Sequence, residues 1–172
     1  MKRKNTYEQS KVVLTVETAL KEFSDVVYRV ALNLAKHDAD ANDIFQDVFM
    51  RFMKYGVGKE FDSMDHAKHW FIRVTMNVYH TWVSKAKRRV EIEKDGTDIN
   101  LKEKKRDLST VTDCVQDLDE KYRIVVHLYY YESYKINEIA LLLGENENTI
   151  KTRLSRAKKM LKTKLKDELG GG

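Results

Sequence analysis

Apolar residues recur every three or four positions along most of this chain, which is the spacing of helices that bury one face. The 172 residues include no proline and only seven glycines, so the chain lacks the turn formers of an all-β fold. The pattern therefore predicts an all-α fold. The first helix is expected to begin near Val16, and its inner stripe is formed by Leu20, Phe23, Val27, Val30 and Leu34.

Two more helical patterns complete a predicted first domain, residues 10–90. The second helix has an apolar face and a polar, acidic face, and Asp38 or Asp40 is placed to cap it. The third helix follows the turn-like stretch KYGVGKE, is capped by Asp62 or Ser63, and ends in several lysines and arginines. We therefore expect a small bundle of three helices.

A charged, aperiodic segment, residues 91–107, separates this bundle from the rest of the chain and is predicted to be a flexible linker. Helical spacing then resumes in a second small domain, residues 108–169, where Asp119 is placed to cap a helix that carries Tyr122, Val125, Val126, Leu128 and Tyr129. A chain with 42% hydrophobic residues can bury one modest core or two small ones. The sequence leaves the arrangement of the two domains open.

Near the C-terminus, the stretch INEIALLLGENENTIKTRLSRAKKMLK, residues 136–162, has the spacing of a helix-turn-helix. Gly144 stands where a left-handed residue would end the first helix, and Asn146 can cap the second. The outer face of that second helix is polar and basic, as expected of a helix that enters the major groove of DNA. The DNA-binding candidates on this helix are Asn148, Thr149, Lys151, Thr152, Arg153, Ser155, Arg156 and Lys159.

The positive charge of the chain is concentrated in this region. Lys and Arg number 32 against 27 Asp and Glu, a formal net charge of +5. Residues 147–166 alone hold eight basic residues and a single acid. A solvated helix face would also explain such a charge run, but the turn glycine, the cap and the one-sided charge together favour DNA binding.

Several other classes of protein find no support. Cys114 is the only cysteine, so an intramolecular disulfide is impossible, and no apolar run reaches the roughly 18 residues of a membrane span. The N-terminus has no apolar segment behind its charges, so we expect a cytoplasmic protein without membrane insertion. His66 and His69 could share a metal, but no second cluster completes a site. We expect no metal, no cofactor and no enzymatic activity.

Two parts of the chain resemble the bacterial sigma factors. DADANDIFQDVFMRFMKY and HAKHWFIRVTMNVYHTWVSKAKRR resemble the central domain of that family, and LDEKYRIVVHLYYYESYKINEIALLLGENENTIKTRLSRAKKML resembles its C-terminal, promoter-binding domain. Their order and spacing are similar to the compact extracytoplasmic-function (ECF) group, over about residues 15–165. The resemblance implies a factor that binds core RNA polymerase and directs initiation at specific promoters, with the minus-thirty-five element read by the C-terminal domain.

The resemblance also implies partners and their sites. DANDIFQDVF is similar to the sigma helix that docks on the β′ clamp coiled coil of the polymerase, and the β flap is a second implied contact. The third helix resembles the element that recognises and melts the minus-ten region, where Asn77 matches a family asparagine. An anti-sigma factor is left open as a further partner. The implied polymerase-binding residues are Asp43, Gln46, Asp47 and Met50, and the minus-ten candidates are Asn77, Tyr79, His80, Thr81, Ser84, Lys85, Arg88 and the stacking residue Phe61.

One departure from the family pattern affects DNA binding. Glu145 and Glu147 stand just after the turn glycine, where family members often carry a proline or a small residue. These acids would weaken phosphate contact or select for cytosine, because glutamate accepts a hydrogen bond from the cytosine amino group.

Two alternative functions stay open: an autonomous helix-turn-helix regulator that acts without polymerase, and a helical protein that sequesters a transcription factor. A gel shift with and without core polymerase separates them.

Overall fold

A computed structural model describes residues 11–92 and 110–170 of the chain. These residues are almost entirely helical, which confirms the predicted all-α class. The predicted linker lies outside the described residues, except that residues 91 and 92 end a helix. The elements are β1 (Val12–Val13), α1 (Val16–Ala35), α2 (Asp38–Tyr55), β2 (Glu60–Phe61), α3 (Met64–Ile92), α4 (Thr110–Gln116), α5 (Glu120–Val126), the π-helical segment η1 (His127–Tyr131), α6 (Ile136–Leu143) and α7 (Glu147–Gly170).

Polar side chains set the helix boundaries of the first unit, α1 to α3. The Thr18 amide donates to Thr15 Oγ1 at the start of α1, and the His66 amide donates to Ser63 Oγ at 3.0 Å, so Ser63 is the predicted cap of α3. The cap predicted for α2 is wrong, because His37 holds the cap position and Asp38 is already helical. The acids of α2 instead lie in its first turn, where negative charge suits the helix dipole.

Stacked aromatic rings form the core of the first unit. Phe71 of α3 lies 4.7 Å from Phe23 of α1 and 5.1 Å from Phe52 of α2, measured between ring centroids. Phe52 and Phe71 are fully buried, and burial of each such ring stabilises the fold by about 1.5–3 kcal/mol. β1 pairs antiparallel with β2, so that Val12 faces Phe61 and the N-terminal strand closes one end of the bundle.

In the second unit, α4 to α7, a π-helical turn changes the predicted helix register. Segment η1 follows α5 directly, and its wider turn rotates the following side chains out of the stripe predicted for a regular helix. Leu128 is fully buried, whereas the neighbouring Tyr129 is 36% exposed. Tyr130 and Tyr131 are also exposed.

The helix-turn-helix has the predicted turn. Gly144 adopts φ +65°, a left-handed conformation that ends α6, and the Glu145 amide donates to the Ala140 carbonyl at 2.9 Å. Asn146 then caps α7, because its Oδ1 accepts from the Thr149 amide at 2.8 Å. The two helices of the motif are therefore fixed by local interactions that the sequence already indicates.

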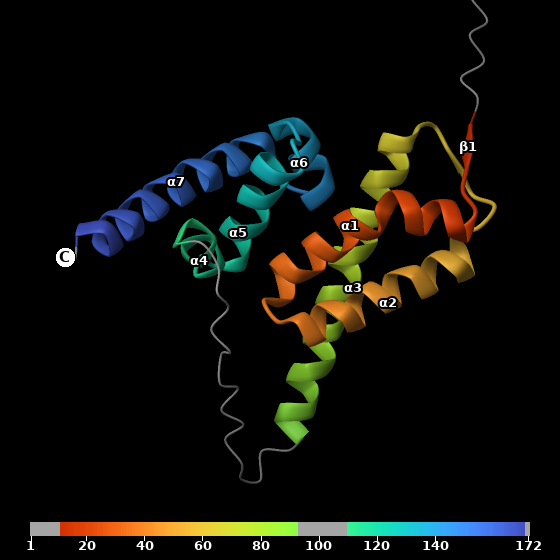
Figure 1. Ribbon diagram of the computed structural model, residues 1–172, viewed down its shortest axis with the longest axis horizontal. Helices are drawn as coiled ribbons and strands as arrows, with labels where there is room; N and C mark the ends of the chain where they lie inside the picture. The colour runs from red at the N-terminus through yellow and green to blue at the C-terminus, as the bar shows by residue number, and fades with distance from the viewer. Residues whose placement is uncertain (1–10, 93–109, 171–172) are drawn as a thin grey trace, which may run out of the picture.

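The two units pack against each other, an arrangement that the sequence left open. α5 lies against α1, and α6 lies against the N-terminal part of α3 (Figure 1). One continuous hydrophobic core runs from Leu14 of the first unit to Leu154 of α7. A smaller cluster beneath α7 joins Val115, Leu118, Tyr122, Val126 and Ala157.

Candidate polymerase and nucleic-acid interfaces

The outer face of α2 carries the residues expected to bind polymerase. Ala41, Ile44 and Val48 are fully buried on the opposite face of the helix. The spacing of i, i+3, i+4 and i+7 gathers the candidates into a single exposed stripe. The stripe consists of Asp43, Gln46, Asp47 and Met50, all of them exposed.

A groove of about 550 Å³ connects this stripe to α3. Asp47 and Met50 line one side of it, and Asn77 lines the other. Sequence reasoning missed Arg51 and Lys54, which also line it. Arg51 lies one turn after Asp47 and Lys54 lies two turns after it, on the same face of α2, and this spacing is the signal that could have found them. The remaining lining residues are Tyr55, Trp70 and Val74.

The groove continues into a polar stripe along the C-terminal half of α3. Its residues are spaced so that they share one face of the helix. The Thr81 hydroxyl donates to the Asn77 carbonyl and the Ser84 hydroxyl to the His80 carbonyl, both at 2.8 Å. Each hydroxyl oxygen keeps its acceptor lone pairs on the outer side. The exposed residues of the stripe are Asn77, His80, Thr81, Ser84, Lys85 and Arg88.

Two aromatic candidates for the minus-ten site are not on this surface. Phe61 is 0% exposed because strand pairing with Val12 turns its ring into the core, 6.0 Å from Trp70. Tyr79 is 9% exposed, and its hydroxyl donates to Glu120 of α5 at 3.0 Å. Burial and the nearby Glu120 carboxylate raise the Tyr79 pKa to about 12. In this conformation neither ring offers a face to a base, so the expectation that Phe61 stacks on DNA is corrected to a core role.

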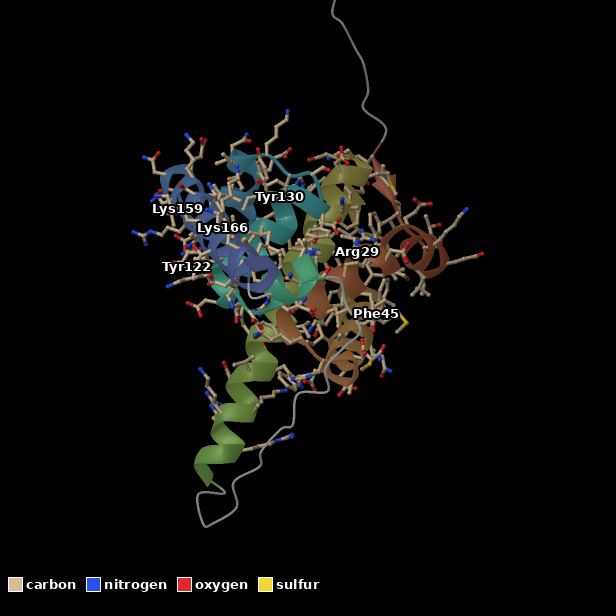
Figure 2. The ribbon with its side chains drawn as sticks, turned by 60° about the vertical axis from the view of Figure 1, so that its left-hand side comes forward. Arg29, Phe45, Tyr122, Tyr130, Lys159 and Lys166 are labelled. Atoms are coloured by element: carbon tan, nitrogen blue, oxygen red, sulfur yellow. The ribbon has the colours of Figure 1, made fainter. Side chains whose placement is uncertain are left out.

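The outer face of α7 carries the other predicted site. A groove of about 590 Å³ lies at its N-terminal half, between α7 and the start of α5. Lys121 and Tyr122 of α5 line it, and sequence reasoning missed them because they lie more than 20 residues before the helix. Figure 2 shows Tyr122 and Lys159 toward one side of the molecule and Phe45 of α2 toward the other. From α7 and its cap the groove takes Asn146, Asn148, Thr149, Thr152, Arg153 and Arg156, and Lys151, Ser155 and Lys159 are exposed nearby.

The two acids after the turn glycine have different surroundings. Glu145 Oε1 lies 2.6 Å from Arg153 Nη2, a contact that draws the guanidinium back along the helix and leaves the Arg153 side chain 23% exposed. Glu147 lies 3.8 Å from Lys151, and both of these side chains are more than half exposed. The acids therefore neutralise part of the positive charge at the N-terminal end of α7.

The histidine and aspartate cluster at the start of α3 is held by the ion pair of Lys11 with Asp62 and by the Asp62 amide, which donates to His66 Nδ1 at 3.2 Å. Lys11 Nζ lies 2.6 Å from Asp62 Oδ1, and His66 Nδ1 lies 3.4 Å from Asp62 Oδ2. The hydrogen bond and charge of Lys11 lower the pKa of the Asp62 carboxyl. Within residues 11–92 and 110–170, no group of three or more His, Cys, Asp or Glu side chains is arranged to hold a metal ion. No helix in those ranges has the length and apolarity needed to cross a bilayer.

Comparison with known proteins finds one family for both units. The family model for Sigma-70 region 2 matches residues 20–89, and the model for Sigma-70, region 4 matches residues 108–161. RNA polymerase sigma factor SigV of Bacillus subtilis is 30% identical over 171 residues, which cover 98% of each chain. ECF RNA polymerase sigma factor SigM of the same organism is 26% identical over 164 residues, covering 87% of this chain and 94% of SigM.

A solved structure shares the fold. It is the co-crystal structure of the sigma factor RpoE with the anti-sigma factor NepR from Bartonella quintana, with a TM-score of 0.72 and 23% sequence identity. The match covers 87% of this chain and 96% of that chain. The sequence relationship to SigV, across nearly the whole of both chains, establishes the family. The chain belongs to the ECF group of RNA polymerase sigma factors, which bind the core enzyme and direct initiation at specific promoters.

Proposed function

We propose that the two units of this sigma factor have different functions. Residues 10–90 bind core polymerase and recognise and melt the minus-ten element, and residues 108–169 read the minus-thirty-five element. The observation that carries the proposal is the presence of two separate exposed polar surfaces, the α2–α3 groove with its acidic stripe and the basic face of α7. The protein acts in the cytoplasm and is not an enzyme by itself.

The acidic stripe of α2 is the contact for the β′ clamp coiled coil. Asp43 and Asp47 supply negative charge, and the 57% exposed Met50 supplies an adaptable apolar side chain. Complementary charge of this kind sets the orientation and rate of docking. The β flap is the second polymerase contact in this proposal.

The groove between α2 and α3 holds the melted minus-ten strand. Asn77 offers an amide to a base edge, and Tyr55, 67% exposed, offers a ring face. Stacking of a base on such a ring contributes about 1–3 kcal/mol. Lys54 Nζ lies 5.1 Å from the centroid of the Tyr55 ring, where its charge is also near the path of the phosphates. Tyr55 takes the stacking role that the sequence suggested for Phe61.

The outer face of α7 enters the major groove of the minus-thirty-five element. Asn148, Thr149 and Thr152 lie in the first turns, from which side chains reach base edges. Arg156 and Lys159 lie further along the helix and contact phosphates. Lys121 of α5 adds a cation at the other wall of the same groove.

Transcription in vitro with purified core polymerase and a library of promoter fragments tests these assignments. Asp47→Arg is expected to abolish binding of the chain to core polymerase, with the helical content unchanged, because it reverses the charge of the stripe. Glu22→Arg, on an exposed face of α1, is the matched charge reversal and should leave binding intact. Undiminished binding of Asp47→Arg would remove the stripe from the polymerase interface.

A gel shift tests the alternative of an autonomous regulator. Such a protein would bind its operator tightly without polymerase, and the sigma relationship does not favour it.

An anti-sigma factor is a further partner in this proposal, supported by the anti-sigma complex of the RpoE relative that shares the fold. Co-purification from cells with the tagged chain would identify that partner.

A further inference from the structure

The sulfur atoms that solvent reaches most easily lie together on α2. Met50 and Met53 are 57% and 51% exposed, whereas Met76 is 6% exposed and Cys114 is 1% exposed. Among the residues that the structure describes, Met50 and Met53 are the two sulfur-containing side chains that are more than half exposed. A small reagent in solution that reacts with sulfur therefore has its readiest access at this helix.

Met50 lies inside the acidic stripe of α2. It follows Asp47 by three residues, and both side chains line the groove of about 550 Å³ between α2 and α3. Met53 follows Gln46 by seven residues and lies at the edge of the same stripe, but it is not one of the residues that line the groove. A partner that docks on the stripe would therefore cover the Met50 sulfur.

A methionine thioether reacts with peroxides without assistance from neighbouring groups. The sulfur lone pair attacks one oxygen of hydrogen peroxide, and the O–O bond breaks. The proton of the transferred hydroxyl passes to the departing hydroxide, which leaves as water, so the sulfur is oxidised by two electrons and the peroxide is reduced. The product is a polar sulfoxide. A dithiol reductase reverses the step, because two thiols form a disulfide while the sulfoxide oxygen leaves as water.

Oxidation of Met50 changes a side chain that is solvated in the free protein and buried in the docked one. The buried face of α2, with Ile44 and Val48, lies on the other side of the helix, so the sulfoxide does not disturb the core. On docking, the sulfoxide oxygen must give up its hydrogen bonds to water, and a buried acceptor without a partner is unfavourable. The adaptable apolar surface of the thioether is lost as well.

We propose that Met50 is an oxidation site through which peroxides lower the affinity of this sigma factor for core polymerase. The inference rests on the proposed assignment of the acidic stripe to the polymerase contact. Conversion of Met50 to its sulfoxide is expected to weaken binding roughly tenfold, as burial of one unpaired polar group does. Because the sulfoxide can be reduced, the effect is reversible, and it does not need a cysteine.

Peroxide treatment of the purified full chain tests the proposal. The chain is exposed to hydrogen peroxide, the peroxide is removed with catalase, and untreated core polymerase is then added in a fluorescence anisotropy titration. Peptide mass spectrometry measures the oxidised fraction at each methionine. We expect Met50 and Met53 to gain an oxygen well before the buried Met76, and circular dichroism should show unchanged helical content.

The affinity for polymerase is expected to fall roughly tenfold in step with the oxidised fraction of Met50. A methionine sulfoxide reductase supplied with a dithiol should restore the affinity. A sample in which Met50 is fully oxidised and polymerase binding is unchanged would overturn the proposal.

Variants identify which sulfur is responsible. Met53→Leu is the matched control, because Met53 has nearly the same exposure on the same helix. Met53→Leu and Cys114→Ser should lose affinity after peroxide as the wild type does, whereas Met50→Leu should have the same affinity before and after treatment. Each protein is compared with its own untreated sample, so a change in starting affinity does not affect the result. Equal peroxide sensitivity of Met50→Leu and the wild type would refute the role of Met50.

The charge reversal at Asp47 separates this inference from the assignment of the stripe. If Asp47→Arg abolishes polymerase binding while the chain oxidised at Met50 binds normally, the stripe is the contact and only the oxidation site is refuted. If Asp47→Arg binds polymerase as the wild type does, the assignment of the stripe itself is wrong, and the inference that rests on it is refuted with it.

Discussion

At the scale of single residues, the sequence predicted well what neighbouring positions decide and poorly what distant positions decide. The exposure of Asp47, Asn77 and Arg156 follows from helical spacing, and the structure confirms it. Phe61 was expected to face DNA, but its orientation depends on pairing with Val12, nearly fifty residues earlier. The contact of Arg153 with Glu145 likewise depends on the turn geometry, which brings the acid beside the arginine.

Glu145→Gln should strengthen DNA binding by releasing Arg153. A further cation available to phosphates is expected to tighten binding to duplex DNA roughly five- to tenfold near 0.1 M salt and to steepen the salt dependence by about one ion. Fluorescence anisotropy with the full chain over a series of salt concentrations measures both. Asp117→Asn removes an acid paired with Lys164 elsewhere on the same unit and is the control for net charge. An equal gain in DNA affinity for both variants would mean that the lost negative charge, and not the release of Arg153, causes the tighter binding.

At the scale of the elements, the start of α3 and the helix-turn-helix were predictable because their signals are local, whereas the predicted cap of α2 was wrong. Ser63, Gly144 and Asn146 have the roles that residue type and position indicated. The π-helical turn was not predictable, because its sequence HLYYY also suits a regular helix. That turn moved Tyr129 outward and set Glu132 at the boundary of the two units. Local interactions therefore predicted the start of α3 and the helix-turn-helix. The π-helical turn and the exposure of Tyr129 depend on tertiary packing.

Gly144→Ala should destabilise the protein by about 1 kcal/mol through backbone conformation alone. Gly144 has φ +65°, and a Cβ there would meet no atom within 4 Å, so crowding contributes nothing. Urea unfolding followed by circular dichroism measures the loss. Gly144→Asn is the matched control, because asparagine tolerates the left-handed region and should retain most of the stability. Similar losses for Ala and Asn would point to a cause other than the left-handed backbone.

At the scale of the whole molecule, the sequence indicated two helical units but could not indicate that they close on each other. The deciding contacts join residues about 90 to 100 positions apart, such as Arg123 with Asn33 and Arg29 with Glu132. No periodicity or composition reports such pairs.

The pH dependence of closure provides a final test of this boundary. Burial alone would raise the pKa of the Glu132 carboxyl, but contacts with His127, Arg29 and Lys68 outweigh it and lower the pKa from 4.5 to about 2. A carboxyl with a depressed pKa in the closed form favours that form above its ordinary pKa, and the contribution is lost as the pH falls toward the lowered value. We therefore expect the distance between spin labels at Glu22→Cys of α1 and Lys162→Cys of α7, in a Cys114→Ser background, to lengthen as the pH falls from about 4.5 to about 2. Electron paramagnetic resonance on the full chain measures this distance.

Glu132→Gln should flatten this acid response, because glutamine does not titrate and cannot attract Arg29 and Lys68 as a carboxylate does. Asp62→Asn removes a different carboxyl with a lowered pKa, one paired within the first unit, and should keep the wild-type profile. If Glu132→Gln and the wild type open over the same pH range to the same extent, other carboxyls control closure. If only Glu132→Gln loses the response, the Glu132 carboxylate is the group that holds the two units together.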